Sequence, residues 1–453
     1  MKKILVLLKI YKGDLNTFDE TALEAALRFP YSEVQVLSMC PMSAEGSLRK
    51  LTRLGVKSIL VSDAAYAGSD TVATSTILAK AINRYNPDLV FTGRNSFDGD
   101  TGQTPFMLSE LLSFQMISHV IKIDSNHVET RENEAFDLNE KQIVSFEKIF
   151  PLRSPSIFSK ENNVEVIDNS VLNININDIG FNGSPTIVNK SFPNEDNRRF
   201  VKFKEFSELD TLIKEALNAK DNNVTEEVEK APFGLYVGNI EPIAKKYFVS
   251  YEKLDIKDKT LEQIEEEIQN KNASAILWEE ALPYKEIASR IAIRMRAGLC
   301  ADCIKFAYRN GVFYMTRPAL GGNINAEIYC KSAISMATIK SPKATNDVVF
   351  SLGRGSLSNL ETVKELAKKY NALIVCSRPL ADSDVFPYSY QVGLTGKQIS
   401  PKVLVTIGID GAIQHIVGIC TSGTIISINK GKNAPIFDYS DYGIVMDVNN
   451  IKL

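Results

Sequence analysis

The feature that most constrains the fold is an alternation of short apolar segments with longer amphipathic ones, which continues to about residue 125. Runs of the strand type lie at residues 4–8, 34–37, 58–61 and 89–92. Segments with helical periodicity lie between them, at residues 21–29, 47–54 and 71–85. This alternation is typical of a parallel sheet with helices packed on its faces, so we expect an α/β fold.

The same alternation returns twice, from Phe233 and from Asp347. Residues 120–150 instead contain short alternating runs, including residues 142–146, which predict antiparallel strands appended to the edge of the first sheet. Residues 160–232 are rich in Asn, Asp, Glu and Lys and are the best linker candidate, although residues 206–217 have helical character. We therefore expect three α/β units with mainly parallel, Rossmann-like sheets. The expected parts are residues 1–205, a linker at 206–231, 232–344 and 345–453.

Composition and charge exclude several classes of function. Lys and Arg total 52 against 55 Asp and Glu, so a net charge of -3 offers no basic field to nucleic acid. The apolar runs are far shorter than the ~20 residues that cross a bilayer, so we expect no membrane insertion. Six scattered cysteines suggest reduced thiols in a cytoplasm. Cys300 and Cys303 form one C-x-x-C pair without a second pair, so we expect no metal site.

The third unit carries the most informative motif. A strand at residues 348–350 runs into Gly353-Arg354-Gly355, a helix follows, and the next strand ends at Ser377-Arg378. Glycines in such a turn let backbone N–H groups approach a phosphate at the carboxyl end of a strand. A single turn of this kind is also compatible with a purely structural role. Later strands deliver further glycine turns and polar residues to the same predicted edge, so we expect a nucleotide site there.

These motifs, in this order and spacing, resemble the electron transfer flavoproteins. The C-terminal residues are similar to the FAD-binding domain of that family's alpha subunit through Gly353-Arg354-Gly355, Ser377-Arg378, Gln391-Val392-Gly393, Thr395-Gly396-Lys397, Gly411-Ala412-Ile413-Gln414-His415 and Asp441-Tyr442-Gly443. Residues 298–303 and 317–323 resemble the N-terminal domain of the alpha subunit. Residues 19–26, 88–93 and 98–104 resemble the beta subunit. The resemblance therefore implies a beta-like and an alpha-like subunit fused in one chain, beta-like half first, with the asparagine-rich linker as the joint.

The resemblance also implies that the C-terminal domain binds FAD without a covalent bond. His415 would lie at the flavin C2 carbonyl as a cation or N–H donor, and Arg378 near N5, with Thr395 beside N5 or O4. The alternatives are purely structural roles: a core histidine for His415 and a surface ion pair for Arg378. The complete set of expected FAD residues is Arg354, Gly355, Ser377, Arg378, Gln391, Val392, Gly393, Leu394, Thr395, Gly396, Asp410, Gly411, Ala412, Ile413, Gln414, His415, Asn429 and Asp447.

Two of these residues depart from the family pattern. Asp410 stands where the family usually has Ser, and its charge would repel a nearby pyrophosphate unless it points away or pairs with a cation. Leu394 replaces the usual Gln and removes an amide from the flavin's surroundings. Both departures put the redox tuning in doubt more than the binding.

A second nucleotide site is expected in the first half. Thr104-Pro105 predicts a helix start with the Thr hydroxyl at the cap, and the preceding loop leads into it, which makes a plausible anion site. The resemblance implies AMP there, or a second FAD in members that bifurcate electrons; a loop that binds nothing is the alternative. The candidates are Asn16, Asp98, Asp100, Thr101, Gly102, Gln103 and Thr104.

The function that the resemblance implies is electron transfer between proteins through FAD, rather than conversion of a small substrate. The expected partners are a dehydrogenase donor and a quinone reductase or other acceptor, although the segment at residues 150–158, where the family has a docking loop, is short. One alternative is an electron-bifurcating, NADH-oxidising flavoprotein with two FADs. The other is a nucleotide-binding regulatory protein without redox chemistry.

Overall fold

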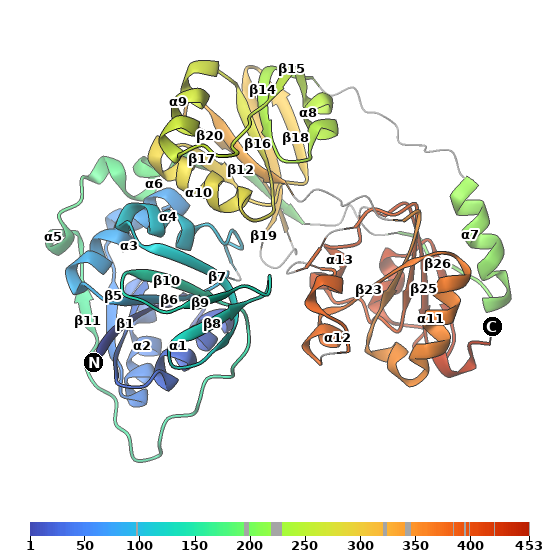
Figure 1. Cartoon of the computed structure of the whole chain (residues 1–453), viewed down its shortest axis with the longest axis horizontal. Helices are drawn as coiled ribbons and strands as arrows, with labels where there is room; N and C mark the ends of the chain where they lie inside the picture. Colours follow the sequence, from blue (N-terminus) through green and yellow to red (C-terminus); the bar gives the residue numbers. More distant parts are fainter. Residues whose placement is uncertain are drawn as a thin grey trace. The chain divides into compact units, whose positions relative to one another are not determined.

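The computed structural model describes the chain except residues 97, 194–198, 219–228, 320–323, 340–345, 384, 394–395, 398, 421 and 453 (Figure 1). Helices pack on mainly parallel sheets, so the expected α/β fold class is confirmed. The chain divides into two compact units. The first comprises residues 1–190, 229–317 and 326–339, and the second comprises residues 191–228, 318–325 and 340–453.

The first unit begins with a sheet in the order β11-β5-β4-β1-β6-β10-β7-β8-β9. The strands are β1 (Lys2–Leu7), β4 (Ser32–Met39), β5 (Lys57–Val61), β6 (Leu89–Gly93), β7 (Gln115–Ile123), β8 (His127–Thr130), β9 (Ala135–Asp137), β10 (Gln142–Phe146) and β11 (Glu165–Ile167). As expected, β8 and β9 extend one edge in antiparallel pairing. The same prediction was wrong for β10, which lies between β6 and β7 and is parallel to both. All five of its residues are buried, as an interior strand requires.

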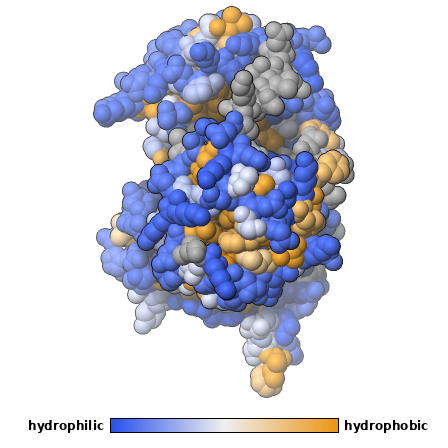
Figure 2. Space-filling model, turned by 90° about the vertical axis from the view of Figure 1, so that its right-hand side faces the viewer, coloured by the Kyte–Doolittle hydropathy of each residue, from blue (hydrophilic) through white to orange (hydrophobic). Residues whose placement is uncertain are grey.

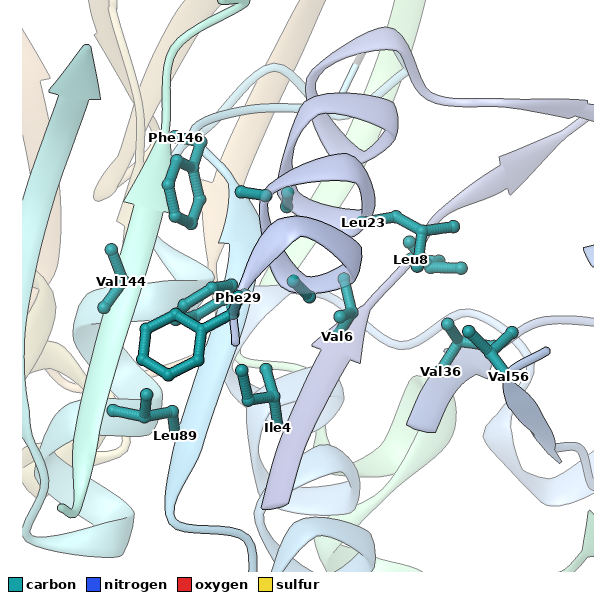
Figure 3. Close-up of a cluster of buried hydrophobic side chains, with 14 of the residues drawn as sticks. Ile4, Val6, Leu8, Leu23, Phe29, Val36, Val56, Leu89, Val144 and Phe146 are labelled. Atoms are coloured by element: carbon teal, nitrogen blue, oxygen red, sulfur yellow. The ribbon is translucent and has the colours of Figure 1, made fainter. Parts of the chain in front are cut away.

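Helices cover both faces of this sheet, so β1 is buried on both sides. Ile4 and Val6 belong to one core cluster, and Leu5 and Leu7 to another, as the two-residue period of a strand dictates. Figure 3 shows the first cluster, in which Phe146 and Val144 lie on one strand beside a helix. The helices of this part are α1 (Thr17–Arg28), α2 (Glu45–Leu51), α3 (Thr71–Tyr85), α4 (Thr104–Leu112), α5 (Asn169–Leu172) and α6 (Gly180–Gly183).

A second parallel sheet of the first unit has the order β15-β14-β16-β21-β17. Its strands are β14 (Ala231–Val237), β15 (Phe248–Lys253), β16 (Ala275–Glu279), β17 (Gly298–Cys300) and β21 (Ser335–Ile339), and its helices are α8 (Glu241–Tyr247), α9 (Leu261–Lys271) and α10 (Tyr284–Met295). A further sheet consists of β12 (Thr186–Pro193), β20 (Ile324–Cys330), β19 (Val312–Ala319) and β18 (Lys305–Arg309). Glu110 of α4 accepts hydrogen bonds from Arg290 and Arg294 of α10, each at 2.8 Å, and so ties the two halves of the unit together.

The second unit contains a parallel sheet in the order β13-β26-β25-β24-β22-β23. Its strands are β13 (Lys202–Phe203), β22 (Val348–Leu352), β23 (Leu373–Cys376), β24 (Val403–Ile407), β25 (Thr424–Asn429) and β26 (Tyr442–Val445). Its helices are α7 (Leu209–Asn218), α11 (Leu360–Lys369), α12 (Arg378–Asp382) and α13 (Ile413–Ile416). From β22 onward the strands lie in the order 2-1-3-4-5, so the winding direction reverses between β22 and β24.

Helix α7 forms within the segment that the sequence assigned to a linker. Leu209, Leu212 and Ile213 on its apolar face join the core of the second unit together with Phe350. The helical character expected at residues 206–217 is therefore confirmed, and the apolar stripe of the helix is buried. The division at residues 205, 231 and 344 stays a prediction.

The surface mixes polar and apolar side chains. Figure 2 shows the face on the right of Figure 1, where hydrophobic residues gather among hydrophilic ones. Scattered apolar side chains of this kind are normal on globular proteins. Among the residues that the structure describes, no helix is both long and apolar enough to cross a membrane.

The first core can be tested at Phe146, which is fully buried and makes an edge-to-face contact with Phe91 at a centroid distance of 5.0 Å. We expect Phe146→Ala to lower the opening free energy of β6 and β10 amides by about 3–5 kcal/mol, because it removes buried area and leaves a cavity. Native-state hydrogen exchange measures this quantity. Phe158→Ala, at a side chain that is 85% exposed, should change it by less than about 0.5 kcal/mol. Equal effects of the two variants would contradict the assignment of the core.

Candidate functional site

The carboxyl ends of five parallel strands in the second unit meet at one cavity, which we call the edge cavity. Gly353 follows β22, Ser377 follows β23, Gly408 follows β24, Asn429 ends β25 and Met446 follows β26, and all five line it. Its volume is about 930 Å³. That size lies near the top of the range of roughly 300–1,000 Å³ for ligand sites, and the reversal of winding between β22 and β24 is where such sites form.

Glycines allow the turns after β22 and β24 to approach each other backbone to backbone. A Cβ on Gly353 would lie 2.2 Å from the Gly408 carbonyl oxygen. Gly408 has φ +65°, and a Cβ there would lie 2.5 Å from the Gly355 carbonyl carbon. No side chain fits at this crossing, so backbone groups form that wall of the edge cavity.

The charged residues of the wall favour an anionic ligand. Arg354, Arg378 and Lys430 line the edge cavity together with two carboxylates, Asp410 and Asp447. The cations outnumber the carboxylates by one, and arginine forms strong paired hydrogen bonds with phosphate oxygens. Asp410 does line the cavity. Its negative charge would therefore repel a phosphate placed next to it, as considered from the sequence.

His415 is a buried histidine that also lines the edge cavity. Its side chain lines the edge cavity, yet Nδ1 lies 3.1 Å from the Val392 carbonyl oxygen and Nε2 lies 3.3 Å from the Ser351 hydroxyl. A carbonyl only accepts, so Nδ1 carries the proton and donates, and Nε2 accepts from Ser351. Burial lowers the pKa of His415 to about 4, and the hydrogen bond to Val392 opposes this shift. The ring is therefore neutral at pH 7 and is not the cation that the sequence allowed for.

Arg378 lines the edge cavity and also pairs with a carboxylate on its own helix. It is the first residue of α12, directly after Ser377, and it lines the edge cavity. Its Nε donates to Asp382 Oδ2 at 3.2 Å, so it also takes part in an ion pair.

Asn429 and Asp447 use their side chains to shape the loops of the wall. Asn429 Nδ2 donates to the Ile409 carbonyl at 2.7 Å, and Asn429 Oδ1 accepts from the Gly431 N–H at 2.9 Å. Asp447 Oδ1 accepts from the Asn449 N–H at 2.9 Å. The amide of Asn429 is therefore committed to the loop, although the residue lines the edge cavity.

Most residues expected from the sequence meet at the edge cavity. Those that line it are Arg354, Gly355, Ser377, Arg378, Gln391, Val392, Gly393, Asp410, Gly411, Ala412, Gln414, His415, Asn429 and Asp447. Gly396 and Ile413 do not line it, since Gly396 packs on the Gln391 backbone and successive residues of α13 project in different directions. Leu394 and Thr395 lie outside the described residues. The lining residues that the predicted set omitted are Gly353, Leu357, Ser358, Pro379, Gly408, Ile409, Ile428, Lys430, Met446, Val448 and Asn449. Of these, the two glycines could have been predicted, because each directly follows an apolar strand.

The expected second site converges on one loop of the first unit, residues 98–104. Asp98 pairs with Lys9 at 3.2 Å, Asn16 Nδ2 donates to the Asn95 carbonyl at 2.7 Å, and Asp100 accepts from the Asn95 side chain. Thr101 accepts from the Gln103 N–H at 3.5 Å, and Gly102 has φ +61°. Helix α4 begins at Thr104, one residue earlier than expected. Gln103 occupies the cap and makes no side-chain cap bond, so the prediction that the Thr104 hydroxyl caps the helix was wrong.

Arg317 of β19, which the sequence set omitted, holds this loop. Its two terminal nitrogens donate to the carbonyls of Gly99 and Asp100 at 2.6 and 3.0 Å. Two buried donors beside them, Arg317 Nε and Gln103 Nε2, have no partner among the described residues. Buried donors without partners cost free energy, so the loop has unmet hydrogen-bonding capacity.

Comparison with known proteins gives the family. The model described as electron transfer flavoprotein domain matches residues 4–150 and 243–353, more than half of the chain. The model described as electron transfer flavoprotein FAD-binding domain matches residues 344–420.

Three relatives illustrate the likeness. The electron transfer flavoprotein subunit alpha of Thermoanaerobacterium thermosaccharolyticum is 33% identical over 220 residues, which are 38% of this chain and 67% of the relative. Protein FixB of Clostridium saccharobutylicum is 34% identical over 214 residues, 37% of this chain and 64% of the relative. The lactate dehydrogenase (NAD(+),ferredoxin) subunit LctC of Acetobacterium woodii is 30% identical over 256 residues, 46% of this chain and 61% of the relative. The chain thus spans between 61% and 67% of the length of these relatives, and with the family matches it belongs to the electron transfer flavoprotein family.

Proposed function

We propose that this protein carries electrons between redox partner proteins through FAD bound in the edge cavity. One convergence supports the proposal: most of the residues expected for FAD line a single cavity, and the FAD-binding match covers three of the five turns that build it. Bound FAD supplies the one-electron chemistry. The chain supplies binding, orientation and local charge.

The residues of the edge cavity fit the parts of FAD. The backbone of the Gly353 to Gly355 turn, Arg354 and Ser377 would hold the pyrophosphate or ribitol. Arg378 offers a fixed cation toward the ring system, which favours its reduced, more negative form. His415 would contribute an uncharged ring to the wall beside the flavin ring system. Hydrogen bonds to Val392 and Ser351 fix the orientation of this ring.

The repeated family match supports a fusion of two subunit-like halves. One domain model matches residues 4–150 and again residues 243–353, and the FAD-binding match follows the second copy. The first match would be the beta-like half, and the second, with the FAD-binding part, the alpha-like half.

The loop at residues 98–104 would hold a second nucleotide, AMP or FAD. Its expected residues converge, and the unpartnered Arg317 Nε and Gln103 Nε2 are donors that a phosphate or a base could satisfy. A second candidate function, electron bifurcation with two FADs, draws on one relative whose name joins NAD(+) and ferredoxin.

The partners would be a dehydrogenase-type donor and a quinone reductase or other acceptor, in the cytoplasm. The described cysteines are all unbridged thiols. The alternative function is that of a nucleotide-binding regulatory protein without redox chemistry. Such a protein would bind no flavin, and this distinguishes it from an electron carrier.

A visible spectrum with analysis of extracted nucleotides tests these functions together. We expect the purified chain, incubated with FAD, to show flavin absorbance with one FAD per chain and AMP as the second nucleotide. Two FADs per chain would favour bifurcation. A colourless protein after incubation with FAD would contradict electron transfer.

The crossing of the two glycine turns predicts a large effect of one methyl group. Gly408→Ala should weaken FAD binding by at least tenfold, because alanine tolerates φ +65° poorly and its Cβ would displace the Gly355 turn. Fluorescence titration with FAD measures the dissociation constant. Gly431→Ala is the matched control after the adjacent β25, since the nearest atom to its added Cβ is 3.6 Å away. Similar affinities of the two variants would count against this wall as the FAD site.

The low pKa of His415 predicts a steeper loss of stability in acid. A histidine kept neutral in the fold contributes stability that is present above its unfolded pKa of 6.5 and is lost as pH falls toward about 4. Between pH 7 and pH 5 the second unit should lose about 2 kcal/mol more in the wild type than in His415→Gln. Hydrogen exchange of β22 and β24 amides at both pH values measures this difference. His127→Gln in the first unit should not change it, and an equal acid dependence for wild type and His415→Gln would refute the assignment.

A further inference from the structure

Arg378 is tied through a carboxylate to a tyrosine that lies outside the edge cavity. Asp382, the last residue of α12, accepts from Arg378 Nε at 3.2 Å through Oδ2. Its other oxygen, Oδ1, accepts from the Tyr388 hydroxyl at 2.7 Å. Arg378 lines the edge cavity, whereas Asp382 and Tyr388 do not. The hydrogen bonds therefore connect a residue of the cavity wall to two residues outside the cavity.

The ion pair alone would not hold the cation. The side chains of Arg378 and Asp382 are 30% and 43% exposed, and an exposed pair four residues apart on a helix contributes little to stability. The ion pair leaves the carboxylate of Asp382 free to rotate. The Tyr388 hydroxyl restricts this rotation, because it donates to the second carboxylate oxygen. With a hydrogen bond at each oxygen, the carboxylate of Asp382 faces Arg378 in a single orientation.

Tyr388 is itself anchored in the unit. Its ring packs against the core cluster that includes Leu380 and Phe386. Its carbonyl accepts from the Gln391 N–H at 3.0 Å, at the start of the segment where Gln391 and Val392 enter the wall of the edge cavity. Tyr388, which holds Asp382, and Gln391, which lines the edge cavity, therefore belong to one packed loop.

The geometry points to Asp382 and Tyr388 as positioning residues that set the plane of the Arg378 guanidinium in the edge cavity. A guanidinium is rigid and planar, so fixing the direction of Nε–H fixes the plane of the whole group. A fixed cation next to FAD strengthens binding and raises its reduction potential. This inference rests on the proposed function, since it takes the edge cavity as the FAD site.

Tyr388→Phe removes one hydroxyl from this network, and the chain offers a matched control. Tyr370 Oη donates to Asp210 Oδ1 at 2.8 Å in the same unit, and that carboxylate also pairs with Lys214 and Lys369, away from the edge cavity. We expect Tyr388→Phe to raise the FAD dissociation constant about three- to tenfold and to lower the reduction potential of bound FAD. Tyr370→Phe should leave both at the wild-type values, as measured by fluorescence titration and by equilibration with redox dyes.

A double-mutant cycle shows whether the tyrosine acts through Arg378. In an Arg378→Gln background, Tyr388→Phe should change neither quantity further, because the group that it positions is gone. Thermal melts confirm that each variant is folded, and Asp382→Asn replaces Tyr388→Phe in the affinity cycle should that variant not fold.

Two results would overturn the inference while the proposed function stands. One is normal FAD uptake with Tyr388→Phe indistinguishable from Tyr370→Phe. The other is a Tyr388→Phe effect that persists undiminished without Arg378. A wild-type protein that binds no FAD would instead remove the proposed function, and the inference with it.

Discussion

The approach of two backbones at the reversal point of the C-terminal sheet is the constraint on which the site depends. Gly353 and Gly355 on one side and Gly408 on the other leave no room for a side chain between them. The two turns therefore meet as bare backbone, next to the cations Arg354 and Arg378. A ligand with a phosphate can come close to such a wall, whereas a wall of side chains would keep it away.

The parallel sheet turns this local constraint into a site. β22, β23, β24, β25 and β26 run in the same direction, so the residues after their carboxyl ends gather at one edge although they are far apart in the sequence. The buried cores beneath them fix the strands, and the polar residues then need only the correct position at a strand end. Binding residues and scaffold are thus specified by separate parts of the sequence.

The sequence was sufficient where a residue's place follows from the strand that precedes it. Arg354, Ser377 and Asn429 follow or end apolar runs, and the structure brings all three to the edge cavity. It was insufficient where the place depends on a partner from elsewhere. Arg317 reaches the loop at residues 98–104 across about 200 positions, and no local pattern indicates that contact. The interior position of β10 was missed for the same reason, since its neighbours β6 and β7 both precede it.

The protonation state of His415 shows a different limit. The resemblance implied a place for it at the ligand, but the charge of its ring depends on burial and on two partners, Val392 and Ser351, that lie 23 and 64 positions away. Because Nδ1–H donates a hydrogen bond to the Val392 carbonyl, Nε2 carries no proton and accepts from the Ser351 hydroxyl. Arg378, which lines the same cavity, keeps its positive charge throughout the physiological pH range. The support of that arginine by Asp382 then becomes part of the site's electrostatics, because the wall has few other fixed positive charges.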